Sequence, residues 1–288
     1  MAENKAEILN PKTDWVFKLM FSKGEEGNKA LISFLNAFLK ETYGTIRKAD
    51  ILNTELTRES PKGETYYLDL LVKTDNGLIV NIEMQQFWSS SFLRRKQLYL
   101  ARTASRFLKK EPKNDDLLYA ISLTVFGCDV PENAKLAEIS GETIMQFIYV
   151  ALNELIGYTM SKDIADYTAK DCWIRFLSNY AQDKQSGMLK KLCALEEGLE
   201  MAEATLFKVT EEERRIAREL SEQYYYDTLA DERAEGREEG EAIGLEKGLF
   251  QGARQKALET AKNLLDMGLS LENIVKATGL TREEIEKL

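Results

Sequence analysis

The chain of 288 residues contains no histidine. Imidazole is a common general base, the central member of Ser-His-Asp and Cys-His triads, and a ligand in Cys2His2 zinc fingers and in histidine-metal nucleases. The sequence therefore excludes all of these chemistries. If the protein is a catalyst, its reactive groups are carboxylates or the side chains of Lys, Tyr, Ser or Cys.

Cysteine and long apolar runs are scarce as well. Cys128, Cys172 and Cys193 are odd in number and lack metal-binding spacing, which is typical of free thiols in a reducing compartment. Every apolar run is shorter than the roughly 18 residues of a membrane span, and the first residues do not resemble a signal peptide. We expect a soluble, cytoplasmic protein with no membrane partner.

The acidic charge is unevenly distributed along the chain. The net charge is −9, yet residues 1–130 hold 19 Lys and Arg against 17 Asp and Glu, a net of +2, so the remainder carries −11. The overall acidity therefore does not exclude nucleic-acid binding by the N-terminal half. The length favours one core domain of about 130–170 residues followed by an extension.

The order of elements predicts an α/β core. Proline and glycine positions and apolar periodicity predict helices at 13–21 and 28–40, strands at 49–58, 66–73 and 78–85, a helix at 92–110 and a strand at 117–126. The last two strands are joined by a helical crossover, so we expect them to be parallel. After Pro131 the pattern predicts helices to the end, including 143–155, 174–181, 188–199 and 211–262.

The second and third predicted strands are joined by a turn at Asp75-Asn76-Gly77. A three-residue loop of this kind, a type I turn closed by a glycine with positive φ, places Thr74 opposite Leu78. Continued along both strands, the same pairing places Asp69 directly opposite Glu83.

The two faces of this hairpin differ in chemistry because side chains alternate along a strand. One face is apolar and holds Leu68, Leu70, Val72, Val80, Ile82 and Met84, and the other holds Asp69, Asn81, Glu83 and Gln85. Opposed Cβ atoms lie about 4.5–5.5 Å apart, so Asp69 and Glu83 can bind one divalent cation through oxygen. A surface hairpin with a solvated polar face has the same alternation, and the residues alone leave both interpretations open.

Three motifs in this order resemble those of the PD-(D/E)xK nuclease family transposases, also called the recombination-promoting nuclease (Rpn) family. They are Pro11-Lys12-Thr13-Asp14-Trp15-Val16-Phe17-Lys18 with Phe21, then Leu68-Asp69-Leu70-Leu71-Val72-Lys73-Thr74, then Asn81-Ile82-Glu83-Met84-Gln85. The resemblance covers roughly residues 9–127. It implies a restriction-endonuclease-like αβββαβ core and a DNA endonuclease that uses Mg²⁺ or Mn²⁺, with Asp69 and Glu83 as metal ligands.

The resemblance implies roles for two more residues. Gln85 stands where the wider superfamily has a lysine that orients or activates the attacking water. Glutamine can hydrogen-bond a water molecule but carries no positive charge, although members of this family commonly have Gln there. Asp14 matches the family's N-terminal acidic position and would add a carboxylate, while a helix N-cap explains Asp14 equally well.

The helix predicted at 92–110 is basic. Five side chains fall on one stripe at helical spacing: Arg95, Tyr99, Arg102, Arg106 and Lys109. Such a ridge can contact phosphates, and Tyr99 can stack on a sugar or base. A solvated basic face is the competing interpretation. A second stripe, of Leu93, Leu100, Ala104 and Phe107, is expected to face the sheet.

The C-terminal part contains a glycine repeat and a possible DNA-binding motif. The glycines at 236, 240, 244, 248 and 252 recur every fourth residue, which permits close approach of a second helix. We expect self-association there, with a helical linker as the equal alternative. Residues 270–288 resemble a truncated helix-turn-helix, and the near-neutral local charge favours a small packing hairpin over a reader of bases.

These observations predict a restriction-endonuclease-like αβββαβ core with a C-terminal all-helical extension. The expected parts are a nuclease-like domain at 9–130, a helical region packed on it at 131–210, and a charged helical tail at 211–288. The expected function is metal-dependent cleavage of DNA in recombination, by an oligomer. The alternative is a catalytically weak or inactive nucleic-acid-binding or scaffold protein that retains the nuclease fold.

Overall fold

The structure is a computed structural model that describes residues 9–52, 55–56, 66–67, 70–88, 92–109, 117–130 and 144–288. It divides the chain into two compact units, Met1–Glu222 and Gln223–Leu288. None of the helices in the described ranges is long and apolar enough to cross a membrane.

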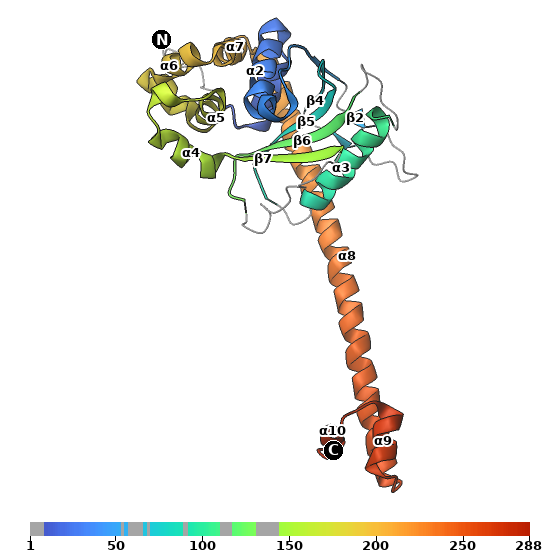
Figure 1. Cartoon of the computed structure of the whole chain (residues 1–288). Coiled ribbons are helices and arrows are strands. Elements are labelled where there is room, and N and C mark those ends of the chain that lie inside the picture. Colours follow the sequence, from blue (N-terminus) through green and yellow to red (C-terminus); the bar gives the residue numbers. More distant parts are fainter. Residues whose placement is uncertain are drawn as a thin grey trace. The chain divides into compact units, whose positions relative to one another are not determined.

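The first unit is built on a five-stranded sheet with the order β1-β4-β5-β6-β7 (Figure 1). The strands are β1 (Ala49–Ile51), β4 (Leu70–Thr74), β5 (Leu78–Gln85), β6 (Tyr119–Phe126) and β7 (Met145–Ala151). The pairs β1–β4 and β4–β5 are antiparallel, whereas β5–β6 and β6–β7 are parallel. A separate pair is formed by β2 (Glu55–Leu56) and β3 (Tyr66–Tyr67). The predicted α/β class and the parallel crossover between β5 and β6 are confirmed.

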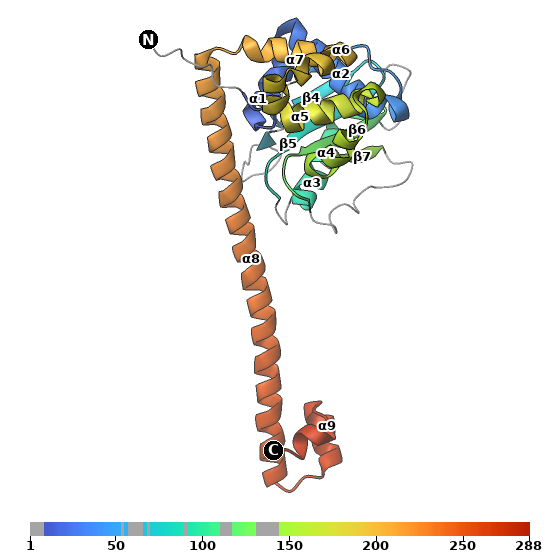
Figure 2. The ribbon, with the colours of Figure 1, turned by 90° about the vertical axis from the view of Figure 1, so that its left-hand side faces the viewer.

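Helices cover both faces of this sheet, as Figures 1 and 2 show from two directions. The larger apolar cluster joins one face to α1 (Asp14–Ser22), α2 (Gly24–Tyr43), α5 (Ala169–Ser186), α6 (Met188–Leu195) and α7 (Glu197–Phe207). It includes Val72, Val80 and Ile82, which confirms that this face of the hairpin is apolar. On the other face, α3 (Phe92–Phe107) packs through Leu100 and Ala104, as its apolar stripe predicted.

The segment expected to be helical at 143–155 is a strand followed by the first turn of a helix. Residues 145–151 form β7, and α4 begins at Leu152 and ends at Ser161. The helix prediction was wrong because Phe147, Tyr149 and Val150 are aromatic or β-branched residues that favour a strand once β6 offers an edge to pair with. A short apolar run does not distinguish a buried strand from a helix by its period.

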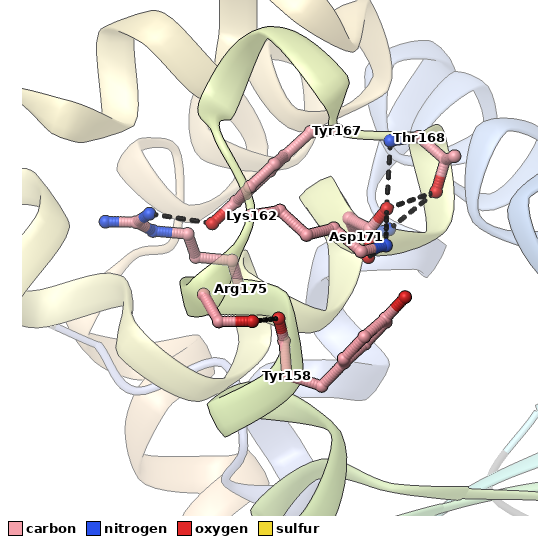
Figure 3. A network of polar contacts seen from close by, with 7 residues as sticks. Tyr158, Lys162, Tyr167, Thr168, Asp171 and Arg175 are labelled. Atoms are coloured by element: carbon pink, nitrogen blue, oxygen red, sulfur yellow. Dashed lines mark hydrogen bonds and ion pairs between the residues drawn. The ribbon is translucent and has the colours of Figure 1, made fainter.

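A network of charged and polar side chains holds the beginning of α5 (Figure 3). Thr168 caps the helix in a capping box, in which its hydroxyl and Asp171 exchange hydrogen bonds with each other's backbone N–H groups. Lys162 donates to the Asp171 carboxylate at 2.8 Å, and Arg175 donates to the Tyr167 hydroxyl at 2.9 Å. These contacts fix the turn between α4 and α5 and leave Asp171 buried with its charge paired.

The second unit ends in three packed helical segments. The long helix α8 (Glu211–Asp266) begins in the first unit and ends in the second, and it is followed by α9 (Leu271–Thr278) and α10 (Arg282–Ile285). A small apolar cluster joins these segments through Ala261, Ile274, Leu280 and Ile285. Thr281 begins α10 with a capping box to Glu284. The C-terminal residues 270–288, expected to form a truncated helix-turn-helix or a small packing hairpin, thus contain two short helices.

Candidate active site

The β4–β5 hairpin has the register that its loop predicted. The observed pairs are Leu70 with Ile82, Leu71 with Asn81, Val72 with Val80, and Lys73 with Ile79. Gly77 closes the turn with φ of 87°, and Thr74 Oγ1 accepts a hydrogen bond from the backbone N–H of Leu78 at 3.1 Å. Asp69 precedes β4 and lies outside the described residues. Its position opposite Glu83 therefore stays a prediction.

The polar face of β5 is buried beneath α3 instead of facing water. Asn81 and Glu83 are each 3% exposed. The parallel pairing with β6 sets Ser122 beside Asn81 and Thr124 beside Glu83, and both of these hydroxyl side chains are buried too. The interpretation as a solvated surface hairpin is therefore wrong, because this face lies between the sheet and a helix.

Several oxygen atoms of this buried layer have no protein partner. Within the described ranges, Asn81 Oδ1, Ser122 Oγ and Thr124 Oγ1 are buried without a hydrogen bond. Leaving one such group unsatisfied costs about 1–3 kcal/mol. Oxygen atoms kept in the interior at that cost mark a candidate binding site for a group that they can coordinate or hydrogen-bond.

Glu83 is paired with a cation from the helix that covers it. The ammonium of Lys96 on α3 forms an ion pair with the Glu83 carboxylate, and the two side chains are only 2% and 4% exposed, respectively. Lys96 Nζ also lies 5.5 Å from the ring centroid of Phe92 and 5.8 Å from that of Tyr99. The ammonium of Lys96 is thus surrounded by a carboxylate and two aromatic rings, each of which attracts a positive charge.

Lys96 is not part of the basic stripe predicted on this helix, so the sequence analysis did not identify it as a site residue. A signal was present, since Lys96 lies three residues after Leu93 and four before Leu100, within the stripe that faces the sheet. A lysine within an apolar stripe is rarely buried without a carboxylate partner, and Glu83 is the carboxylate on the facing strand.

Gln85 ends β5, where the beginning of α1 lies close to the sheet. Its side-chain amide donates to the backbone carbonyl of Phe87 at 2.7 Å. The neighbouring Gln86 donates through Nε2 to the backbone carbonyl of Lys12, two residues before Asp14. This bond holds the beginning of α1 at the C-terminal end of β5.

Asp14 is the first residue of α1 and not its N-cap. Thr13 occupies the cap position, without a side-chain cap bond. The Asp14 carboxylate lies 3.5 Å from Lys18 Nζ, and its side chain is 16% exposed. The N-cap interpretation of Asp14 is therefore wrong, although a carboxylate in the first turn is still stabilised by the helix dipole.

The donor set suits a hard divalent cation. The layer around Glu83 offers a carboxylate and neutral oxygen atoms, which Mg²⁺ and Mn²⁺ prefer over sulfur ligands. The described part of the chain contains no group of three Asp, Glu or Cys residues arranged to hold a metal ion. Asp69, the second carboxylate that the hairpin register predicts for such a site, lies outside those residues, so its part in a metal site stays a prediction.

The basic stripe on α3 is only partly at the surface. Arg102, Arg106 and Lys109 are exposed, and Arg95 is half-buried. Tyr99 is 8% exposed and belongs to the apolar cluster between α3 and the sheet. The expectation that Tyr99 stacks on a nucleic-acid base does not hold in this structure, because its ring packs inside the fold beside Lys96.

The three cysteines are free thiols, as predicted. Burial raises the pKa of Cys172 to about 12 and that of Cys193 to about 11, and nearby carboxylates add to both shifts. Burial is also the main reason why the pKa of Cys128 is raised. Thiols in this state are not nucleophiles at neutral pH, so the carboxylate layer remains the candidate site.

Two family models match separate parts of the chain. The model described as PD-(D/E)XK nuclease family transposase matches residues 11–233. The model described as the C-terminal HTH domain of the Rpn/YhgA-like nuclease family matches residues 254–288. Our preference for a simple packing hairpin at the C-terminus is thereby corrected in favour of a helix-turn-helix domain. The searches of curated proteins and of solved structures gave no match.

Proposed function

Because the chain belongs to the PD-(D/E)XK nuclease family transposases, we propose that it is a metal-dependent endonuclease that hydrolyses phosphodiester bonds of DNA and promotes recombination. Asp69 and Glu83 bind one Mg²⁺ or Mn²⁺, and Asp14 and Gln85 complete the site at the end of β5. The observation that supports this proposal most is the buried layer of unsatisfied oxygen atoms on the same face of the sheet as Glu83.

The chemistry requires no histidine. Asp69 and Glu83 would hold the divalent cation, which would supply a water of lowered pKa and a positive charge for the scissile phosphate. Gln85 orients the attacking water through its amide, which in the present structure is bonded to Phe87. A carboxylate site of this kind is compatible with a chain that contains no imidazole.

We assign DNA contacts to two regions. On α3, Arg95, Arg102, Arg106 and Lys109 neutralise backbone phosphates, which makes binding weaken with salt. The helix-turn-helix domain at 254–288 supplies a second DNA-binding region. In this scheme the nuclease-like domain at 9–130 cleaves DNA. Residues 131–210 support that domain through β7 and the helices after it. Residues 211–288 bind DNA and form the oligomer, and the protein acts in the cytoplasm.

The glycine repeat on α8 is assigned to self-association. In the part of the chain that the structure describes, a Cβ atom at Gly244 or Gly248 would meet no heavy atom within 4 Å apart from the backbone of its own helix. The double variant Gly244→Ala/Gly248→Ala therefore favours the helix by up to about 1 kcal/mol per position within one chain, but its methyl groups clash with a closely packed second copy. Light scattering that shows a smaller oligomer for this variant supports the assignment, and an unchanged mass contradicts it.

The cleavage proposal is tested with supercoiled plasmid and Mg²⁺ or Mn²⁺. Purified full-length protein is expected to nick or linearise the plasmid, whereas Asp69→Ala and Glu83→Ala are inactive. Glu41→Ala, which removes an exposed carboxylate from α2, is the matched control and is expected to cut like the parent. Equal cutting by the parent and the two site variants would indicate a contaminating nuclease and refute the proposal.

The burial of Glu83 beneath Lys96 favours one alternative, a DNA-binding protein that retains the nuclease fold without cleavage. Measuring both DNA binding and plasmid cleavage with the same purified proteins distinguishes the nuclease from this alternative. A parent protein that binds duplex DNA but leaves the plasmid intact with either metal identifies the alternative.

A further inference from the structure

Resting on the proposed function, we propose that Lys96 is the positively charged group of the Glu83 site, inserted from α3 to contact the phosphate of the substrate. Gln85, two residues after Glu83, is neutral and cannot supply that charge. The ion pair with Glu83 is what brings the Lys96 ammonium to the carboxylate that is assigned to the metal.

The surroundings of Lys96 keep its charge in place. Its side chain is 2% exposed, so the ammonium is held inside the fold, unlike the exposed cations farther along α3. Phe92, one turn earlier, and Tyr99, about one turn later, lie within 6 Å of Nζ by their ring centroids. Aromatic faces attract an ammonium group. The two rings therefore hold the Lys96 ammonium beside Glu83 even when the Glu83 carboxylate binds a metal ion.

The balance of charges in the proposed site assigns Lys96 to the substrate phosphate. In the proposed site, Asp69 and Glu83 would balance the charge of one divalent cation, and the ammonium of Lys96, which lies beside Glu83, would balance the charge of one phosphate group. Without DNA, the same charge repels the divalent cation and competes with it for Glu83. One assignment thus predicts two measurable effects, weaker metal binding in the free protein and stronger catalysis with substrate.

The test compares full-length variants in two assays. Mn²⁺ binding without DNA is measured by electron paramagnetic resonance of the free ion, and plasmid cleavage yields kcat and KM. The variants are Lys96→Met, the relocated charge Lys96→Met/Gln85→Lys, and Lys190→Met as a control, since Lys190 is an exposed lysine of α6.

We expect Lys96→Met to bind Mn²⁺ at least about tenfold more tightly, because a like charge has been removed from the site. Its kcat is expected to fall about 100-fold or more, the usual loss when one donor to a developing negative charge is removed. The double variant Lys96→Met/Gln85→Lys, which moves the positive charge to position 85, is expected to have a kcat at least about tenfold higher than that of Lys96→Met. Lys190→Met is expected to match the parent in both assays.

A folded Lys96→Met protein whose Mn²⁺ affinity is unchanged or weaker overturns the assignment, and so does a relocated variant that cuts no better than Lys96→Met. If Lys96→Met does not fold, the charge-conserving double variant decides. Cleavage within about tenfold of the parent supports the assignment and loss of cleavage opposes it.

The two proposals fail in different ways. A parent that binds Mn²⁺ through Glu83 but never cuts DNA refutes the nuclease function, while the Mn²⁺ affinities still decide the role of Lys96. A parent whose Mn²⁺ binding is the same after Glu83→Gln refutes both.

Discussion

The ion pair between Lys96 and Glu83 makes a quantitative prediction about stability. Both side chains are almost fully buried, so Lys96→Met leaves a carboxylate without its counter-charge in the interior. Removing one partner of a buried pair costs about 3–5 kcal/mol. The carboxyl group can escape the full cost by taking up a proton, which at pH 7 costs about 3.7 kcal/mol from an ordinary glutamate pKa of about 4.3. We therefore expect a loss of about 3–4 kcal/mol.

The double variant Glu83→Gln/Lys96→Met supplies the comparison. It removes both charges and leaves a methionine to fill the apolar space that the lysine stem occupied between Phe92 and Tyr99. Replacing a buried ion pair by uncharged groups of similar volume is often neutral or stabilising. The double variant is therefore expected to be more stable than Lys96→Met, with a free energy of unfolding that is higher by about 2 kcal/mol or more.

Urea unfolding of the full-length protein, followed by tryptophan fluorescence in the presence of a metal chelator, measures these differences. The three tryptophans, Trp15, Trp88 and Trp173, all lie in the first unit and so report on the unit that contains the pair. The gap between single and double variants is expected to narrow as the pH is lowered, because a protonated Glu83 has no charge to bury. A loss below about 1 kcal/mol for Lys96→Met, or a double variant no more stable than the single one, would refute the reasoning.

Three other predictions concern positions away from the site. Gly198→Ala on α7 places a Cβ in steric overlap with the side chain of Ser33 on α2 and is expected to lower the free energy of unfolding in urea by about 1–3 kcal/mol. The matched Gly157→Ala on α4 meets nothing within 4 Å and is expected to stabilise by up to about 1 kcal/mol; equal effects would show that the α2–α7 contact is looser. Burial raises the pKa of Asp171, but hydrogen bonds from Lys162 and Thr168 outweigh burial, so the pKa lies below its ordinary value. The ionised Asp171 therefore stabilises the folded state above the ordinary pKa. This stabilisation is lost as the pH falls through the lowered pKa. Asp171→Asn is expected to cost about 1–2 kcal/mol at pH 7, with the difference from the parent shrinking in acid, and a pH-independent difference in a thermal-unfolding series would contradict this. Ile274→Ala, in the small cluster of the helix-turn-helix domain, is expected to cost about 2–5 kcal/mol there, which hydrogen exchange detects as lost protection in residues 254–288 with the first unit unchanged.

The hairpin and the crossover were predictable because they depend on local chemistry. A three-residue loop ending in Gly77 sets the register of β4 and β5, and the period of two then assigns each residue to a face. The helix at 92–107 between β5 and β6 forces a parallel pairing, which was observed. The strand at 145–151 was not predictable in the same way, since its conformation depends on the edge that β6 presents.

By itself, the sequence determined which chemistry is possible. It contains no imidazole, the register of its hairpin predicts Asp69 directly opposite Glu83, and it resembles a family whose model matches the chain. Only the tertiary structure decided the environment of these groups. The packing of α3 on the sheet buries Glu83, brings Lys96 to it and takes Tyr99 away from the surface. The physical reason is that spacing along a strand or helix is a local property, whereas the partner of a buried charge is set by which elements pack together.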